Sequence, residues 1–141
     1  MIPKAIILEG VDGVGKSSVR ILISNYNGNH FVLERFTPSI YAYGRFYKRG
    51  LDPSYIASLE EALQSAFDVC PVFLKCSPDV LYERFKTGRH VVELTASDLE
   101  LLQDMMEDYV DNFSILPWMK IDNTNITPQA IFEKIREVFR I

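Results

Sequence analysis

Residues 10–17 read Gly10-Val11-Asp12-Gly13-Val14-Gly15-Lys16-Ser17 and match the pattern G-x-x-x-x-G-K-[S/T] at every defined position. The apolar run at residues 5–8 comes just before this stretch and is typical of a buried parallel strand. Val19, Leu22 and Ile23 follow at helical spacing. Strand, glycine-rich loop and helix therefore come in the order that a phosphate-binding loop requires, which predicts binding of a nucleoside triphosphate rather than a purely structural loop.

Each residue type in the loop has a physical role. Glycines let the backbone curl so that its N–H groups face the phosphates, and the helix that follows adds its positive N-terminal end. Lys16 is expected to reach the β- and γ-phosphates from a solvent-facing position, and the Ser17 hydroxyl to hold Mg²⁺. The predicted cofactors are ATP and Mg²⁺. The predicted nucleotide-binding residues are Gly10, Asp12, Gly13, Val14, Gly15, Lys16, Ser17 and Ser18.

Composition limits the remaining possibilities. The chain has 141 residues, of which 48% are hydrophobic and 24% charged, so residues 1–141 are expected to form a single domain. The net charge of −4 gives no reason to expect a nucleic-acid or anionic-membrane partner. No apolar run reaches membrane-spanning length, and no signal peptide is recognised. Cys70 and Cys76 are interpreted as buried free thiols, which suits a reducing cytoplasm.

Strand and helix signals alternate along the chain. Besides residues 4–8, we expect strands at 30–33, 72–74 and 118–121, and helices at 16–25, 38–50, 52–66, 77–88, 97–113 and 127–139. This alternation predicts an α/β fold in which a parallel sheet of about four strands has helices on both faces. Ligands of such sheets bind at the carboxyl ends of the strands, where the phosphate loop and Glu34-Arg35 both lie.

Several stretches resemble the thymidylate kinases. Residues 8–18 (L-E-G-V-D-G-V-G-K-S-S) look like that family's E-G-x-D-G-x-G-K-S/T, and residues 34–43 (E-R-F-T-P-S-I-Y-A-Y) are similar to its D-R-Y-x-x-S-x-x-A-Y. Residues 77–84 (S-P-D-V-L-Y-E-R) resemble its S-P-E-x-x-x-E-R, and residues 122–128 its last strand–helix junction. The resemblance covers most of the chain and extends to small phage-type nucleotide kinases. It implies a P-loop nucleotide kinase fold and phosphoryl transfer from ATP to a deoxynucleoside monophosphate such as dTMP.

Two departures from the family concern the acceptor. The chain runs almost directly from its first helix to the strand that bears Glu34-Arg35. The family's second strand and following helix, which help to hold the acceptor base, are therefore expected to be missing. In addition, Glu34 stands where thymidylate kinases carry Asp. Glu-Arg at this position is similar to the E-R-S segment of deoxynucleoside kinases, whose acceptor is a nucleoside.

The candidate acceptor-side residues suit phosphoryl transfer, which needs positioning and positive charge more than covalent help. Arg35 is predicted to hold an acceptor phosphate bidentately, or else to pair with a nearby carboxylate. Glu34 is predicted to order water on Mg²⁺ or to accept the acceptor's proton, or else only to orient Lys16 or Arg35. Tyr43 is predicted to stack on the acceptor sugar or base and crowd a 2′-hydroxyl, and Ser39 to contact the acceptor. The alternatives are an ordinary tyrosine and a plain first-turn serine.

Residues 84–93 are predicted to form a lid because of their place in the fold. Arg84 and Arg89 would close over the donor phosphates and exclude water. Charges on a solvated helix end are the alternative. With Lys16, Glu34 and Arg35, these two arginines make up the predicted catalytic set.

Three functions remain open from the sequence: a deoxynucleoside monophosphate kinase, which is favoured, a deoxynucleoside kinase, and a nucleotide-binding regulatory protein without kinase activity. Loss of the second strand would also leave residues 30–33 at the edge of the sheet. Proteins normally cover or pair such edges. We therefore expect the edge to be covered by residues 25–29 or by a second subunit, with a homodimer favoured.

Overall fold

A computed structural model describes residues 2–26, 30–88 and 93–141. Its sheet has four parallel strands in the order β2-β1-β3-β4. The strands are β1 (Lys4–Glu9), β2 (Phe31–Glu34), β3 (Asp68–Lys75) and β4 (Met119–Asp122). The predicted α/β class and the four-stranded parallel sheet are confirmed.

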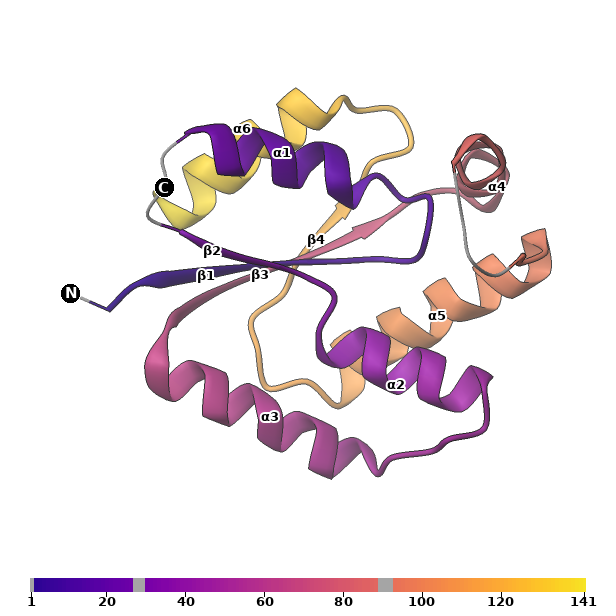
Figure 1. Cartoon of the computed structure of the whole chain (residues 1–141), viewed down its shortest axis with the longest axis horizontal. Helices are drawn as coiled ribbons and strands as arrows, with labels where there is room; N and C mark the ends of the chain where they lie inside the picture. Colours follow the sequence, from indigo (N-terminus) through magenta and orange to yellow (C-terminus); the bar gives the residue numbers. More distant parts are fainter. Residues whose placement is uncertain (1, 27–29, 89–92) are drawn as a thin grey trace.

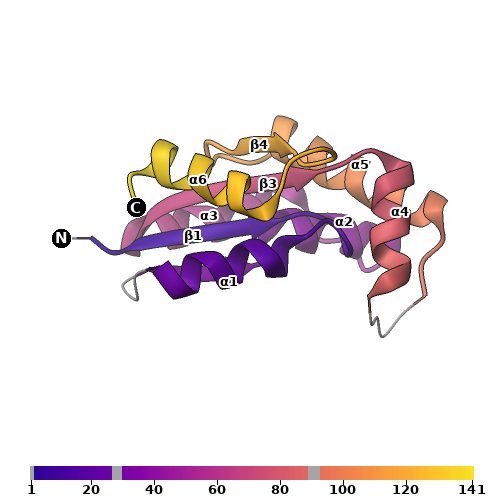
Figure 2. The same ribbon diagram turned by 90° about the horizontal axis from the view of Figure 1, so that it is seen from above.

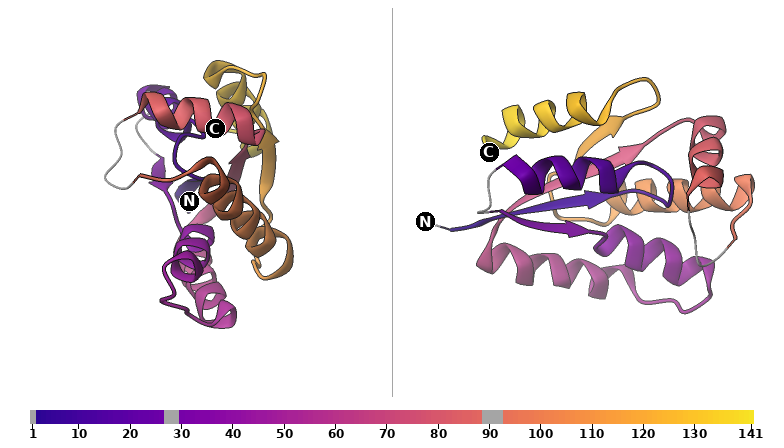
Figure 3. Two further views of the ribbon diagram at one scale, coloured as in Figure 1. Left: turned by 90° about the vertical axis from the view of Figure 1, so that its right-hand side faces the viewer. Right: turned by 45° about the horizontal axis from the view of Figure 1, so that its top comes forward.

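Six helices surround this sheet in the described part of the chain. They are α1 (Lys16–Tyr26), α2 (Thr37–Phe46), α3 (Pro53–Ala66), α4 (Pro78–Thr87), α5 (Ala96–Asn112) and α6 (Pro128–Phe139). Figure 1 shows α1 and α6 on one face of the sheet and α2, α3 and α5 on the other. Seen from above, α1 and α6 lie over the strands (Figure 2). Helix α4 runs across the carboxyl end of the sheet (Figure 3), which is the end where the phosphate loop leaves β1.

Strand β3 begins earlier than the sequence predicts. The prediction placed this strand at residues 72–74, although proline, which has no N–H to donate, is normally confined to strand starts and edges. In the structure the strand begins at Asp68, and Pro71 lies opposite Ile7 of β1 in the middle of the sheet. The hydrogen bonds between the rest of β3 and β1 therefore outweigh the one backbone donor that Pro71 lacks.

Helix starts follow the expected chemistry. Asp52 caps α3 by accepting a hydrogen bond from the Ser54 amide at 2.8 Å. Thr95 and Asp98 form a reciprocal capping box that starts α5 one residue before the predicted position. The Thr127 hydroxyl caps α6 through the Ala130 amide at 3.1 Å. These local caps fix where each chain segment turns back along the sheet.

Strand β2 is an edge strand, as the sequence predicts. Its register pairs Leu8 of β1 with Glu34, which brings Glu34 beside the start of the phosphate loop. Within the described residues no strand pairs with the outer side of β2. The proposed cover at residues 27–29 lies outside the described residues, and residues 25–26 belong to α1. No helix in the described ranges is both long and apolar enough to cross a bilayer.

Candidate active site

The phosphate loop turns tightly against two other parts of the protein. Gly10 and Gly13 have positive φ angles of 145° and 89°, which side-chain-bearing residues rarely adopt. A Cβ atom at Gly10 would lie 2.6 Å from the Leu74 carbonyl oxygen, and one at Gly13 would lie 3.0 Å from the Phe85 backbone. Glycine is therefore required by close approach as well as by backbone conformation. Val14 is fully buried and joins the loop to the core.

Lys16 is more buried than the sequence led us to expect. Its side chain folds back over the loop, and its Nζ donates hydrogen bonds to the carbonyl oxygens of Gly10 at 2.5 Å and Val11 at 3.1 Å. The residue is only 8% exposed. Burial lowers the pKa of Lys16, while the carboxylates of Glu9 and Glu34 oppose that shift. The prediction of a solvent-facing lysine is thus wrong, because the loop carbonyls hold the ammonium inside the turn.

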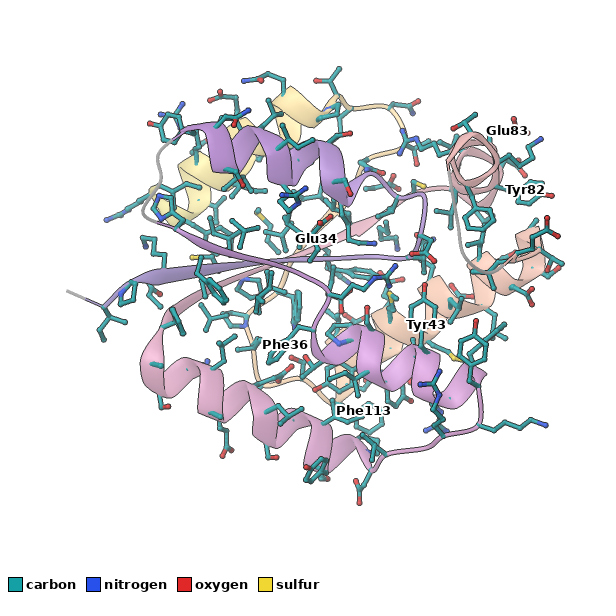
Figure 4. The ribbon with its side chains drawn as sticks, in the orientation of Figure 1. Glu34, Phe36, Tyr43, Tyr82, Glu83 and Phe113 are labelled. Carbon is teal, nitrogen blue, oxygen red and sulfur yellow. The ribbon has the colours of Figure 1, made fainter. Side chains whose placement is uncertain are left out.

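The residues predicted to hold Mg²⁺ lie together. The Ser17 hydroxyl donates to Glu34 Oε1 at 3.0 Å, and Arg20 Nε lies 2.8 Å from Glu34 Oε2. Figure 4 shows Glu34 between the sheet and α1. A hydroxyl and one carboxylate fit Mg²⁺, which takes oxygen ligands and is usually held by one or two carboxylates together with substrate phosphates. Within the described ranges, no cluster of three or more His, Cys, Asp or Glu side chains offers an all-protein metal site.

Arg35, which is predicted to bind the acceptor, lies beside the phosphate loop. Its φ of 84° is in the left-handed region, and its guanidinium forms an ion pair with Asp12 of the loop. The guanidinium also lies 5.2 Å from the centre of the Tyr43 ring. A cavity of about 460 Å³ is lined by Asp12, Gly13, Gly15, Lys16, Ser17, Ser18, Glu34 and Arg35. The structure therefore brings together all the predicted loop residues except Gly10 and Val14 with the predicted Glu34-Arg35 pair.

The two remaining acceptor candidates differ from each other. The Ser39 hydroxyl donates to Glu9 Oε1 at 2.7 Å, and the residue is buried, so this side chain already has an internal partner. Tyr43 projects from α2 toward the carboxyl end of the sheet (Figure 4), and its ring is held by Arg35. The Tyr43 hydroxyl is buried and makes no hydrogen bond within the described residues. Burial raises its pKa, and Arg35 opposes the shift.

Arg84 does not lie in a loop above the phosphates. It belongs to α4, and its guanidinium donates to Asn123 Oδ1 and to the Asn123 carbonyl oxygen, each at 3.1 Å. Asn123 Nδ2 in turn donates to the Val14 carbonyl oxygen at 2.6 Å. Arg84 therefore braces the rear of the phosphate loop against the end of β4. The other predicted lid cation, Arg89, lies outside the described residues.

A second cavity of about 290 Å³ adjoins this brace. It is lined by Gly13, Val14, Gly15, Ser18, Arg84, Asn123, Ile126, Pro128 and Ile131. Its walls combine apolar side chains with one flat guanidinium, which is a surface on which a planar base can stack. The cavity shares Gly13, Gly15 and Ser18 with the phosphate cavity, so the two cavities adjoin the same part of the loop.

Sequence reasoning missed two residues of this site. Glu9 is fully buried at the end of β1 and accepts four hydrogen bonds, and Asn123 is 3% exposed and holds the loop from behind. A carboxylate directly after four buried apolar residues was the available signal for Glu9. Asn123 had a weaker signal, its place after a short strand, because its partner in the loop is 109 residues away.

Comparison with known proteins supports the fold. No protein-family model matches the chain, and no curated protein sequence matches it. Among solved structures, the YorR protein from Bacillus subtilis in complex with phosphorylated GDP has a TM-score of 0.75 at 18% identity, over 96% of this chain and 95% of that one. Deoxyadenosine kinase from M. mycoides with bound dCTP has a TM-score of 0.66 at 16% identity, over 96% and 98%. The same kinase with bound dATP has a TM-score of 0.63 at 14% identity, over 98% and 100%. The chain thus has the fold of P-loop nucleotide kinases.

Proposed function

We propose that this protein is an ATP-dependent kinase that transfers the γ-phosphoryl group to a deoxynucleoside monophosphate, with dTMP as the favoured acceptor. The observation that carries the proposal is the single cavity lined by Lys16, Ser17, Glu34 and Arg35. Lys16, the cation proposed for the donor phosphates, follows β1 and the loop, and Arg35, the cation proposed for an acceptor phosphate, follows the neighbouring strand β2. The fold shared with nucleoside and nucleotide kinases supports the same reaction class.

The side chains have separable roles in this reaction. Lys16 places a cation at the inner wall of the loop, where charge on the β- and γ-phosphates would be stabilised. Ser17 and Glu34 would hold Mg²⁺, which neutralises phosphate charge when it is bound. Arg35 would exchange its ion pair with Asp12 for a bidentate contact with an acceptor phosphate. The Tyr43 ring would hold that guanidinium in place beside the acceptor.

A deoxynucleoside kinase is the second candidate. Two observations favour it: Arg35 is already neutralised by Asp12, and three of the similar solved structures are of a deoxyadenosine kinase. With an uncharged acceptor, Arg35 would keep its partner and bind the 5′-oxygen through its remaining donors. Glu34 would then be free to accept the proton of the attacking hydroxyl.

The deciding experiment is an assay of ADP release with ATP and Mg²⁺ across the four deoxynucleosides and their monophosphates, with products identified by chromatography. We expect turnover with monophosphates and formation of the diphosphates. Turnover with nucleosides alone would establish the second candidate instead. Nucleotide binding without turnover on any acceptor would indicate a regulatory protein. The Lys16→Met variant controls for contaminating kinases.

We also propose that the protein acts as a homodimer in the cytoplasm. The unpaired outer side of β2 motivates the dimer, since an exposed strand edge is a ready surface for a second copy. The two buried free cysteines fit a reducing compartment. Multi-angle light scattering at several protein concentrations tests the dimer, and a mass equal to one chain at all of them contradicts it.

A further inference from the structure

Glu9 is a buried carboxylate whose hydrogen-bond partners are all donors. It is the last residue of β1, directly before the phosphate loop, and it is fully buried. Its Oε1 accepts from the Gly10 amide at 3.2 Å and from the Ser39 hydroxyl at 2.7 Å. Its Oε2 accepts from the amides of Phe36 at 2.8 Å and Ser39 at 2.7 Å. One side chain therefore contacts both the donor loop and the segment that follows Glu34-Arg35.

Glu9 also serves as the missing cap of α2. The helix begins at Thr37 after Phe36, which provides no side-chain cap, and Pro38 has no N–H. The Ser39 amide would otherwise be an unpaired donor in the first turn, and the Glu9 carboxylate satisfies it. A carboxylate at this position is further favoured by the positive end of the helix dipole. The start of α2 is thus anchored to β1 rather than to its own preceding loop.

The same contacts hold Arg35 in an uncommon conformation. The Arg35 amide donates to the Leu8 carbonyl oxygen at 3.1 Å, and the next amide, that of Phe36, donates to Glu9. Two consecutive amides are therefore fixed by two consecutive residues of β1. Between them Arg35 has its φ of 84°. A residue other than glycine stays in such a region only when its surroundings determine it, and such residues cluster at functional sites.

We infer that Glu9 is a positioning residue: it sets the Glu34-Arg35 pair at the distance and angle from the phosphate loop that phosphoryl transfer requires. The inference rests on the proposed function. Glu9 touches no reacting atom and acts through the Phe36 and Ser39 amides on one side and the Gly10 amide on the other. Misplacement of an acceptor-side group by about 1 Å can cost roughly 10²-fold in rate.

Glu60 provides a matched control for a merely structural role. It is also fully buried, and it accepts from the hydroxyls of Thr37 at 2.6 Å, Ser114 at 2.8 Å and Tyr109 at 3.1 Å. It therefore holds the start of α2 from the opposite side, but its hydrogen bonds join α2, α3 and the end of α5 and do not reach the phosphate loop. Any general effect of disturbing a buried carboxylate should be the same for Glu9 and Glu60.

The test compares Glu9→Gln with Glu60→Gln. A glutamine retains the size of the side chain and one acceptor oxygen, but its amide nitrogen cannot accept from the donors that face it. For Glu9→Gln we expect kcat/KM for the acceptor to fall about 10–100-fold with the Kd for ATP within about threefold. Both variants should lower the Tm, and Glu60→Gln should lower it by at least as much as Glu9→Gln. Glu60→Gln should nevertheless leave kcat/KM nearly unchanged. Equal losses of kcat/KM in the two variants would overturn the inference.

Two further measurements keep the inference testable if a glutamine variant folds poorly or the wild type proves not to be a kinase. Ser39→Ala and Ser114→Ala remove one hydroxyl donor from Glu9 and Glu60, and only Ser39→Ala should lower acceptor use. Amide hydrogen exchange by NMR needs no activity: Glu9→Gln should lose protection at Gly10 or at Phe36 and Ser39, whichever of them the amide nitrogen faces, and Glu60→Gln should lose none there. Unchanged protection in Glu9→Gln overturns the inference, whereas an inactive wild type with that selective loss overturns only the kinase assignment.

Discussion

The donor and acceptor sides of the cleft are built in different ways. The phosphate loop leaves β1, which has neighbours on both sides in the sheet, and its rear carbonyl at Val14 is held by Asn123. Of the proposed acceptor residues, Glu34 ends β2 and Arg35 follows it, and β2 is a four-residue edge strand in which no position is fully buried. Donor geometry is thus fixed by the core, while acceptor geometry depends on a few contacts with β1.

This difference has a functional consequence. Changes on the donor side should affect every acceptor equally, because the loop geometry does not depend on what is bound beside it. Changes on the acceptor side should alter acceptor use and leave ATP binding intact. An open edge beside the acceptor also leaves few groups to read its base, so selectivity among deoxynucleoside monophosphates should be loose. The variants below test how far the two sides are independent.

The largest effect is expected at Lys16. Replacing it with Met should lower turnover by at least about 10²–10³-fold for every acceptor, because a buried cation at the phosphates is lost. The Tm should change little, because relief from burying the charged lysine offsets the loss of its two hydrogen bonds to the loop carbonyls. Steady-state kinetics with several acceptors checks the loss of turnover, and a thermal melt checks the Tm. The matched control is Lys86→Met, at an exposed lysine whose partners in the described residues are Glu83 at 2.9 Å and the Tyr82 ring, both on its own helix; it should behave as wild type.

Arg35 should show the next largest effect, confined to the acceptor. Arg35→Ala removes charged hydrogen bonds worth about 1.5–3 kcal/mol, so kcat/KM for a monophosphate acceptor should fall about 10–100-fold. The Kd for ATP, measured by titration calorimetry, should stay within about threefold. Arg45→Ala is the control, because Arg45 is also on an aromatic ring of α2, that of Tyr41 at 5.1 Å. If ATP affinity fell by the same factor as kcat/KM for the acceptor, Arg35 would only hold Asp12 in place.

Much of the donor side was predictable from sequence, and the reason is local. The loop motif, its preceding strand and its following helix are contiguous, so their geometry follows from glycine positions and periodicity alone. The order of strands and helices was predictable for the same reason. The burial of Lys16 was not, because it depends on carbonyls that only the folded loop turns inward.

The acceptor side and the brace were harder to predict because their partners are distant in sequence. Arg84 is a basic residue at the place where a lid is expected, yet its guanidinium contacts Asn123, 39 residues further along the chain. Glu9 and Ser39 are 30 residues apart, and nothing in the local sequence of either indicates the other. Sequence patterns report on a residue's neighbours in the chain, whereas these roles come from the parallel crossover that brings strand ends together.

Arg84 distinguishes a brace from a lid. If Arg84 braces the loop, Arg84→Ala should weaken ATP binding about tenfold. This loss is near the lower limit for charged hydrogen bonds, because the Arg84 side chain is partly exposed. KM for the acceptor should not change. A lid cation would give the opposite result, a lower kcat with nearly unchanged ATP affinity. Lys86→Ala on the same helix is the control, and ATP affinity measured beside kcat decides between the two roles.

The smallest effect concerns a buried thiol near the amino end of β3. Cys70 of β3 is 1% exposed, and burial raises its pKa from 9.0 to about 11. The unfolded chain therefore loses this proton first as the pH rises. The stability that the buried thiol provides is fully present below pH 9.0 and is lost between 9.0 and about 11.

Urea unfolding at pH 8 and pH 10 measures this effect. At pH 10 the free energy of unfolding should be about 1 kcal/mol lower on account of Cys70. Tyrosines also titrate in this range, so the informative quantity is the difference between wild type and Cys70→Ala. The cavity left by alanine costs the same at both pH values and cancels, as does the titration of every other group. If the pH dependence of the two proteins is identical, water reaches the Cys70 thiol in the folded protein, and the burial of this part of β3 is contradicted.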